Sequence, residues 1–221
     1  AKTGRSDFAD LQRLIPASDK VAELKQLTRD QDTLIRTQTR LVNQLTACLK
    51  AYYPVALDLF SKLQQKSTLV FLQAYPTVDA ARAASLGALQ QQLKHTRHPQ
   101  PATAAASILE QIHHPQLQAE VVLTRTKSRL MLALVSQLLP LIEQIADYDK
   151  EISTLFLTHE DHVLFESLPR AGQHLAPRRF SEIGDDRQRY QNASSLQALG
   201  GTSPVLYQSG MYSKAHRRLG C

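Results

Sequence analysis

The sequence lacks several features that would define its class at once. Its 221 residues include no tryptophan, and aromatic residues make up only 6% of them. Cys48 and Cys221 are the only cysteines, and two isolated cysteines form neither a disulfide framework nor a zinc site. The longest apolar runs, such as 130–134, fall far short of the roughly 20 residues of a membrane-spanning helix. With no basic start followed by an apolar stretch, we expect no signal peptide, a cytoplasmic protein and no membrane partner.

Acidic residues are also absent from the C-terminal end. The last one is Asp186, although the chain continues with Arg187, Arg189, Lys214, Arg217 and Arg218. The formal net charge is +6. A basic end without carboxylates is typical of a surface that binds phosphates, and a solvated basic tail is the alternative interpretation.

Helical spacing dominates the rest of the chain. Leucines at steps of three and four predict one long helix over 18–52, with Ser18 as its N-cap, and a second over 117–157. Pro140 should kink the second helix. The two helices can pair antiparallel, in a coiled-coil-like manner, or build a dimer interface. Shorter helices are expected over 55–116, and no alternating strand pattern is evident, so the predicted fold is all-α.

Two short segments after Thr158 are candidates for chemistry. Residues 168–172 (LPRAG) form a turn between two apolar-patterned helices, and such a helix-hairpin-helix-like turn can offer backbone N–H groups to a DNA phosphate. A plain helix–helix turn is the alternative. Further on, Gly200 and Gly201 open an expected loop that reaches Gly210. Ser209 precedes that glycine, and a serine beside glycine can be approached closely by a substrate, although serine–glycine pairs are also common in surface loops.

The order of motifs in the C-terminal part resembles a known family. After the LPRAG turn come EIGD at 182–185, R-Y-x-x-A-x-x-L at 189–196, G-x-x-P at 201–204 and YQSG at 207–210. This succession resembles the C-terminal transposase domain of the insertion sequence 110 family and its 116 and 902 groups. The helical segment with Thr39, Arg40, Asn43, Leu45, Tyr53 and Pro54 is similar to the segment before that domain.

The resemblance implies a DNA recombinase with two catalytic parts. One is a RuvC-like nuclease domain whose acidic residues bind a divalent metal such as Mg²⁺, and the other supplies a serine that links covalently to DNA. A structured guide RNA directs the choice of DNA. By motif, the nucleophile is Ser209, and Asp7 matches the last metal-binding acid. Localisation would be that of a bacterial, nucleoid-associated protein.

Three departures from the family pattern bear on activity. Gly4 stands where a metal-binding aspartate is expected, and glycine has no side-chain ligand atom. Arg170 replaces a usual glycine of the turn and could add a phosphate contact. The chain ends at Cys221, before the basic helix that normally closes the domain. We therefore expect a fragment or truncated product that is inactive alone.

These observations divide the chain into three predicted parts. Residues 1–17 would be the tail of the nuclease domain, 18–157 a long-helix region with a helical insertion at 55–116, and 158–221 a truncated transposase domain. Arg170, Gly172, Gly210, Lys214, Arg217 and Arg218 are the predicted DNA-binding residues. We expect homo-oligomers through the long helices. The rival interpretations are a non-catalytic helical DNA-binding module and a helical oligomerisation scaffold.

Overall fold

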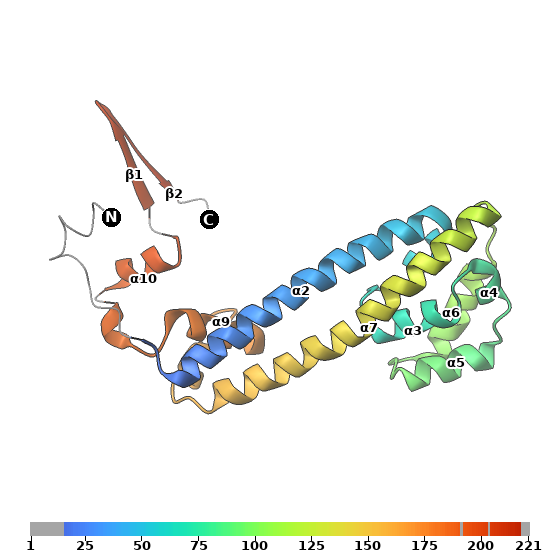
Figure 1. Ribbon diagram of the computed structural model, residues 1–221, viewed down its shortest axis with the longest axis horizontal. Helices are drawn as coiled ribbons and strands as arrows, with labels where there is room; N and C mark the ends of the chain where they lie inside the picture. The colour runs from blue at the N-terminus through green and yellow to red at the C-terminus, as the bar shows by residue number, and fades with distance from the viewer. Residues whose placement is uncertain (1–15, 191, 203, 218–221) are drawn as a thin grey trace. The chain divides into compact units, whose positions relative to one another are not determined.

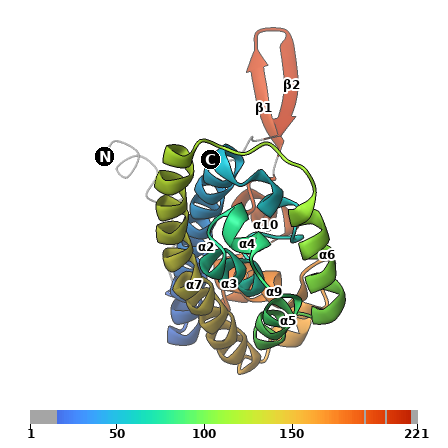
Figure 2. The ribbon, with the colours of Figure 1, turned by 90° about the vertical axis from the view of Figure 1, so that its right-hand side faces the viewer.

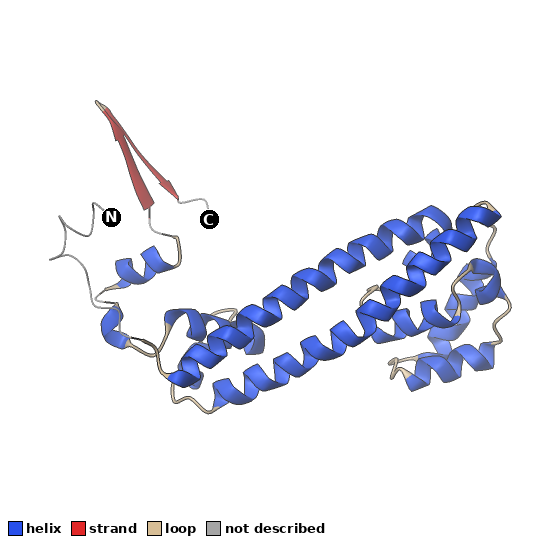
Figure 3. Ribbon diagram, in the orientation of Figure 1, coloured by secondary structure: helices blue, strands red, loops and turns tan. Residues whose placement is uncertain are grey.

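The computed structural model of the protein describes residues 16–190, 192–202 and 204–217. Helices predominate in this part, and the strands are confined to one hairpin near the C-terminus (Figure 3). The α-helices are α2 (Asp19–Tyr52), α3 (Lys66–Ala74), α4 (Val78–Arg82), α5 (Leu86–His95), α6 (Pro101–His113), α7 (Val121–Leu157), α8 (His162–Glu166), α9 (Gly172–Ile183) and α10 (Ala193–Leu199). Short 3-10 turns lie at Pro54–Leu57 and Arg187–Arg189, and the hairpin strands are β1 (Pro204–Ser209) and β2 (Tyr212–Arg217). The predicted all-α class is confirmed.

The chain folds into two compact units. The terminal unit consists of Ala1–Arg29 with Asp149–Cys221, and the central unit is Asp30–Tyr148. Both long helices contribute residues to both units. The predicted domain boundary near Thr158 coincides with the end of α7. The two compact units are defined by packing instead, so they do not test this boundary, which stays a prediction.

In the central unit, α2 and α7 form the antiparallel pair that was one of the two predicted arrangements (Figure 1). The Gln31 side chain donates a hydrogen bond to the Ile145 carbonyl at 3.4 Å, and the Cys48 thiol contacts the Lys127 carbonyl at 3.4 Å. An early residue of α2 thus meets a late residue of α7, and a late one meets an early one. Gln31 is only 3% exposed, so this bond satisfies a buried polar group within the seam.

The core of the central unit lies between this pair and the short helices that pack on it (Figure 2). Its fully buried members come from nearly every helix of the unit: Leu45, Leu49, Tyr53, Phe71, Leu72, Leu89, Leu93, Ile108, Ile112, Met131, Val135 and Leu138. Burial raises the pKa of the Cys48 thiol, which keeps this free cysteine in its unreactive form. The core joins residues far apart in sequence, so the predicted insertion at 55–116 is an integral layer of the unit.

α7 is both long and apolar. By length and composition it could cross a membrane, since an 18-residue window has a mean hydropathy of 1.4, with 28% of that window buried. Met131, Leu134 and Leu138 are buried in the core of the central unit. A helix that contributes a buried apolar stripe to a protein core can have the same mean hydropathy. The composition of α7 is therefore only weak support for a membrane span.

The terminal unit is built around Phe180 of α9, which is 1% exposed. Its ring lies 5.1 Å from Phe165, 5.9 Å from Phe156 and 4.4 Å from His159, measured between ring centroids. Tilted and edge-to-face rings at these separations attract one another in addition to burying apolar area. This cluster fixes α8 and α9 against the end of α7.

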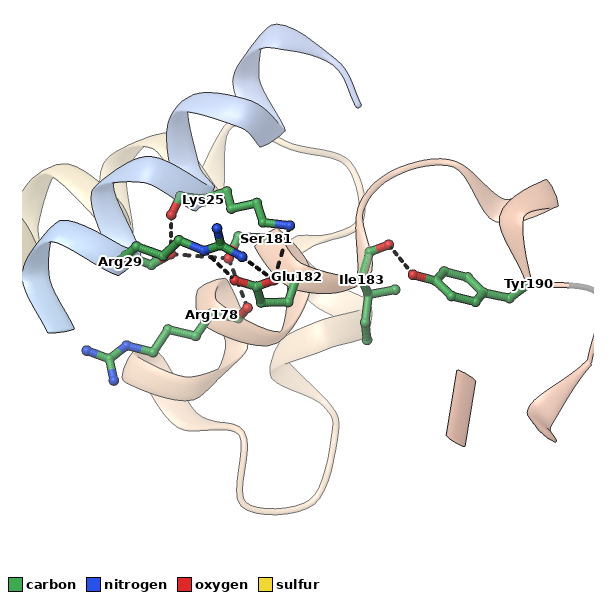
Figure 4. A network of polar contacts seen from close by, with 8 residues as sticks. Lys25, Arg29, Arg178, Ser181, Glu182, Ile183 and Tyr190 are labelled. Carbon is green, nitrogen blue, oxygen red and sulfur yellow. Dashed lines mark hydrogen bonds and ion pairs between the residues drawn. The ribbon is translucent and has the colours of Figure 1, made fainter. Parts of the chain in front are cut away.

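A polar network ties α9 to the start of α2 (Figure 4). The Glu182 carboxylate accepts two hydrogen bonds from the Arg29 guanidinium, at 3.0 and 3.1 Å, and lies 3.1 Å from the Lys25 ammonium. The Thr28 and Ser181 hydroxyls lie 3.3 Å apart beneath this surface, both nearly buried. The hydrogen bond from Arg29 is the largest cause that lowers the pKa of Glu182. The paired carboxylate therefore favours its charged form in the folded protein.

The antiparallel seam can be tested with two leucines of α7. Leu138→Ala should lower the free energy of unfolding by about 2–5 kcal/mol, because Leu138 is fully buried and truncation leaves a cavity. Leu130→Ala is the matched control, since Leu130 is 45% exposed on the same helix, and it should change stability by less than about 1 kcal/mol. Urea unfolding followed by circular dichroism measures both. Equal losses would contradict the described burial.

The Glu182 network predicts a pH dependence of stability. Because the folded-state pKa of Glu182 is lowered, its contribution is complete above the unfolded-state pKa of about 4.3 and is lost as pH falls through the folded-state value. Thermal unfolding between pH 3 and pH 6 should show Glu182→Gln losing less stability on acidification than the parent. The control is Glu23→Gln, an exposed glutamate of α2 in the same unit, which should follow the parent curve.

Candidate functional site

The predicted nucleophile lies at the tip of a β-hairpin and not in the expected loop. Strands β1 and β2 pair antiparallel, with Ser209 opposite Tyr212 and Pro204 opposite Arg217. Gly210 and Met211 form a two-residue turn. The φ angle of Gly210 is 59°, whereas that of Met211 is not positive. Glycine at the first central position is typical of a type II′ turn, whose twist matches that of paired strands. The loop expectation at 200–210 is therefore corrected from Pro204 onward.

The sequence carried a signal for this hairpin. Tyrosine and valine are frequent in strands, and a glycine between two such runs is a hairpin indication. The strands are only six residues long each, and they lack a clean apolar–polar alternation. Periodicity alone therefore missed them, while the turn glycine could have revealed them.

The hairpin exposes Ser209 and gives it two described neighbours on one face. Side chains alternate across a strand, so Ser209, its partner Tyr212 and Lys214 share a face. All three are exposed, and Tyr212 is 57% exposed. The Ser209 hydroxyl is thus open to a large substrate, with an ammonium on a diagonally neighbouring position. The sequence analysis predicted roles for Ser209 and Lys214 and did not consider Tyr212.

The hairpin separates two of the predicted DNA-binding residues. Lys214 is near the turn, whereas Arg217 pairs with Pro204 at the base of the hairpin. At a rise of about 3.4 Å per residue, the backbone of Arg217 lies roughly 17 Å along the strands from that of Ser209. Lys214 is therefore nearer to Ser209 along the hairpin than Arg217 is, and the roles of both residues in DNA binding stay predictions. Arg218 lies outside the described residues.

The predicted turn at 168–172 joins α8 to α9. The Ala171 N–H donates to the Leu168 carbonyl at 3.0 Å, and Arg179 donates to the Pro169 carbonyl at 3.3 Å, which close the turn. Arg170 takes a left-handed conformation with φ 61°, the backbone region that normally favours glycine. Its side chain is exposed. The turn thus forms with arginine in place of the usual glycine, as expected.

α9 begins at this turn with Gly172, which has φ 52°. The N-cap residue, Ala171, makes no side-chain hydrogen bond to the first turn of the helix. Helix N-termini carry unsatisfied N–H groups and a partial positive charge, to which a phosphate can bind. Arg170 and the start of α9 together are a candidate phosphate contact, and the aromatic cluster and the Glu182 network hold that helix in place.

No metal centre is found in the described part of the chain. Within residues 16–190, 192–202 and 204–217, no group of three or more histidine, cysteine, aspartate or glutamate residues is placed to hold a metal ion. Asp7 and Gly4, on which the predicted metal site depends, lie outside these residues. The described side chains therefore do not fit a Mg²⁺ site of their own.

Comparisons with known proteins agree with the motifs at both ends of the chain. A transposase model of the IS110 DEDD type matches residues 1–54, and a model described as transposase IS116/IS110/IS902 family matches residues 162–221. Residues 55–161 lie outside both matches. No solved structure matches the chain significantly.

Three curated proteins are similar along most of the chain. The uncharacterized 44.8 kDa protein of insertion element IS116 from Streptomyces clavuligerus is 32% identical over 97% of this chain and 52% of its own length. The IS117 mini-circle protein of Streptomyces coelicolor, to which its name assigns a provisional transposase role, is 27% identical over 93% of this chain and 51% of its own. The uncharacterized 42 kDa protein of IS900 from Mycobacterium paratuberculosis is 25% identical over 92% of this chain and 51% of its own.

The chain spans about half the length of these curated relatives. The second family match contains the α8–α9 turn and the whole hairpin with Ser209. With matches at both ends and similarity between them, the chain belongs to the IS116/IS110/IS902 family of transposases.

Proposed function

We propose that this chain is part of a DNA transposase that cuts and rejoins insertion-element DNA, with the Ser209 hydroxyl as its nucleophile. The observation that carries the proposal is the exposure of Ser209 at the tip of the hairpin, beside Gly210 and on the same face as Lys214. A nucleophile that attacks duplex DNA must be reachable by a bulky phosphodiester, and a hairpin tip meets this requirement.

The proposed step is a phosphoryl transfer. The Ser209 oxygen bonds to the phosphorus of a DNA phosphodiester while the bond from phosphorus to the leaving strand breaks. The serine proton passes to a base, and the leaving oxygen takes up a proton. Attack by a hydroxyl of a different strand end on the same phosphorus releases Ser209 and joins the new strand. Negative charge develops on the phosphoryl oxygens, and Lys214 is placed to neutralise part of it.

A metal would supply activation that the described residues do not. Serine is a poor nucleophile at neutral pH, and Tyr212 and Lys214 are its described neighbours on that face. Mg²⁺ bound through acids of a nuclease domain, with Asp7 among them, would favour the serine alkoxide. The family resemblance alone supports this part of the proposal.

DNA positioning is assigned to the α8–α9 turn together with the hairpin. Arg170 offers an exposed guanidinium, and Gly172 begins a helix whose first N–H groups have no side-chain cap. Gly210 allows close approach of backbone to the DNA at the hairpin tip. These contacts go to the phosphodiester backbone and so position DNA without reading its sequence.

The partners of the intact protein are also part of the proposal. A structured guide RNA follows from the family resemblance. Homo-oligomers are supported by apolar side chains left exposed on α7, where Val121 is 83% and Val122 is 61% exposed. Exposed apolar residues on a long helix are typical of surfaces that another helix covers. A cytoplasmic, nucleoid-associated location would follow from acting on DNA.

A non-catalytic DNA-binding module is the second candidate function. It is favoured by one observation, namely that no described carboxylate is positioned beside Ser209 on the hairpin face. Such a module would bind DNA with a steep salt dependence and would form no covalent adduct. A helical oligomerisation scaffold would neither bind DNA noncovalently nor form a covalent adduct with it.

The nucleophile assignment is tested with two serines of the hairpin. In the intact transposase that contains this chain, Ser209→Ala should abolish the covalent protein–DNA adduct while leaving DNA affinity within about twofold, because the hydroxyl takes part in bond formation and not in charge pairing. Ser213→Ala is the matched control, since Ser213 is exposed on the same hairpin but lies on its other face. Adducts are detected by denaturing electrophoresis with labelled element-end DNA. An adduct that persists in Ser209→Ala would refute the assignment.

The positioning role predicts a change in salt dependence. Lys214→Ala and Arg170→Gly should each reduce the slope of log binding constant against log salt by about one, since each removes one phosphate contact. Glycine at position 170 keeps the left-handed turn, so α8 and α9 should stay folded. Fluorescence anisotropy with duplex DNA between 50 and 200 mM salt gives the slope. Lys50→Ala, an exposed lysine in the central unit, should leave it unchanged.

A further inference from the structure

The central unit contains an open cavity of about 510 Å³ that has no role in the proposed reaction. It is lined by the loop after α5 and by the beginnings of α3 and α6. Polar and basic residues make up nearly all of its lining, including Gln65, Lys66, Ser67, Arg97, His98 and Gln100. None of the residues that line it is acidic, and none is a large apolar residue. The cavity belongs to the segment that neither family model matches.

Ser67 is the first sign that this cavity takes a ligand. It lines the cavity although it is only 7% exposed, and its hydroxyl makes no hydrogen bond with any described residue. The neighbouring Thr68 hydroxyl, by contrast, donates to the Lys62 carbonyl at 2.9 Å. Because no described residue pairs with this hydroxyl and it lines the cavity, it is available to donate to a polar group of a ligand.

Two helix N-termini contribute further unsatisfied donors. The N-cap of α3 is Gln65 and that of α6 is Gln100, and neither side chain caps its helix. Within the described residues, the N–H groups of Lys66 and Ser67 make no backbone hydrogen bond, because the first bond of this helix runs from Leu69 to Gln65. Uncapped N–H groups of this kind, aided by the helix dipole, favour an anion.

Basic side chains complete the positive lining. Arg97 makes no ion pair with a described carboxylate, whereas Lys66 pairs with Glu143 of α7 at 2.8 Å. Both members of that pair are about 60% exposed, so the pair is weak and Lys66 can exchange its partner for a stronger anion. His98 accepts a hydrogen bond from the Gln100 N–H on Nδ1, which leaves Nε2 to donate.

Arg97 occupies a position where glycine is normal. The His98 N–H donates to the Leu93 carbonyl and the Arg97 N–H donates to the Lys94 carbonyl, the pair of bonds that ends a helix in a Schellman motif. The residue between helix and loop in that motif is left-handed, and Arg97 has φ 56°. A strained arginine at the rim of a cavity is consistent with a use for its side chain.

We propose that this cavity binds a phosphate ester, with the Ser67 hydroxyl, the Arg97 guanidinium and the N-terminal N–H groups of α3 as donors. The volume exceeds that of a phosphate and leaves room for an attached nucleoside. A free nucleotide and the backbone of a nucleic acid present the same phosphate chemistry. The site lies in a different unit from Ser209 and does not depend on the serine reaction.

Binding is measured with the full chain by isothermal titration calorimetry and by amide chemical shifts. The probes are inorganic phosphate, adenosine 5′-monophosphate, adenosine and a single-stranded oligonucleotide without terminal phosphates. Phosphate and the nucleotide should bind and shift the amides of Ser67 and Arg97, and adenosine should not. Binding of the oligonucleotide with the same shifts identifies a nucleic-acid backbone as the source, and its absence identifies the free nucleotide.

Two variants localise the site. Ser67→Ala and Arg97→Gly should each weaken nucleotide binding roughly ten- to hundredfold, the loss of one charge-assisted hydrogen bond. Both should stay folded, because alanine suits a helix and glycine suits the left-handed position. Arg40→Ala, which removes an exposed guanidinium elsewhere in the same unit, should bind like the parent. Binding of adenosine as tight as that of its monophosphate, failure of every phosphate probe, or folded variants with parental affinity would each overturn the proposal.

Discussion

The antiparallel contact between α2 and α7 is the constraint on which the central unit depends. Neither helix can bury its apolar stripe alone, and most of the stability of a helix in a protein comes from the packing of its apolar face. Once the two are paired, their stripes form the surface on which α3, α5 and α6 complete the core. Gln31 bonds to the Ile145 carbonyl inside the seam, which penalises any shift in register, since a slipped pair would leave this buried amide unsatisfied.

In the terminal unit, a few polar residues hold α2 and α9 together, whereas apolar stripes hold the long helices together in the central unit. Glu182 meets Lys25 and Arg29, and Ser181 meets Thr28, so the beginning of α2 holds a helix more than 150 residues further along the chain. α9 is held from its other side by the rings around Phe180. The α8–α9 turn therefore rests on a fixed helix, although Pro169, Arg170 and Gly172 in it are exposed. A rigid support under an exposed turn suits a contact with phosphates, which requires position more than burial.

The two described non-glycine residues with positive φ are both arginines, Arg97 and Arg170. Each closes the end of a helix where glycine would adopt the same conformation with less strain. One lies at the turn before α9 and the other at the rim of the central cavity. Both proposals thus use an arginine held in a left-handed turn, one for the DNA backbone and one for a phosphate ester. The common physical theme is an exposed guanidinium whose backbone is fixed by helix-end hydrogen bonds.

Sequence periodicity determined the two long helices, the shorter helices between them and the turn at 168–172, because each depends on local spacing and on residues that end a helix. Motif order likewise identified the family, and it predicted Ser209 as the nucleophile. Only the tertiary structure decided that the long helices pair within the chain, since their stripes fit an intramolecular and an intermolecular partner equally well. The hairpin around Ser209 also required the structure, because strand pairing is a contact between two short segments and leaves little periodic trace. The cavity at Ser67 and Arg97 was beyond any sequence pattern, since three separate helix ends form it and each of them is unremarkable by itself.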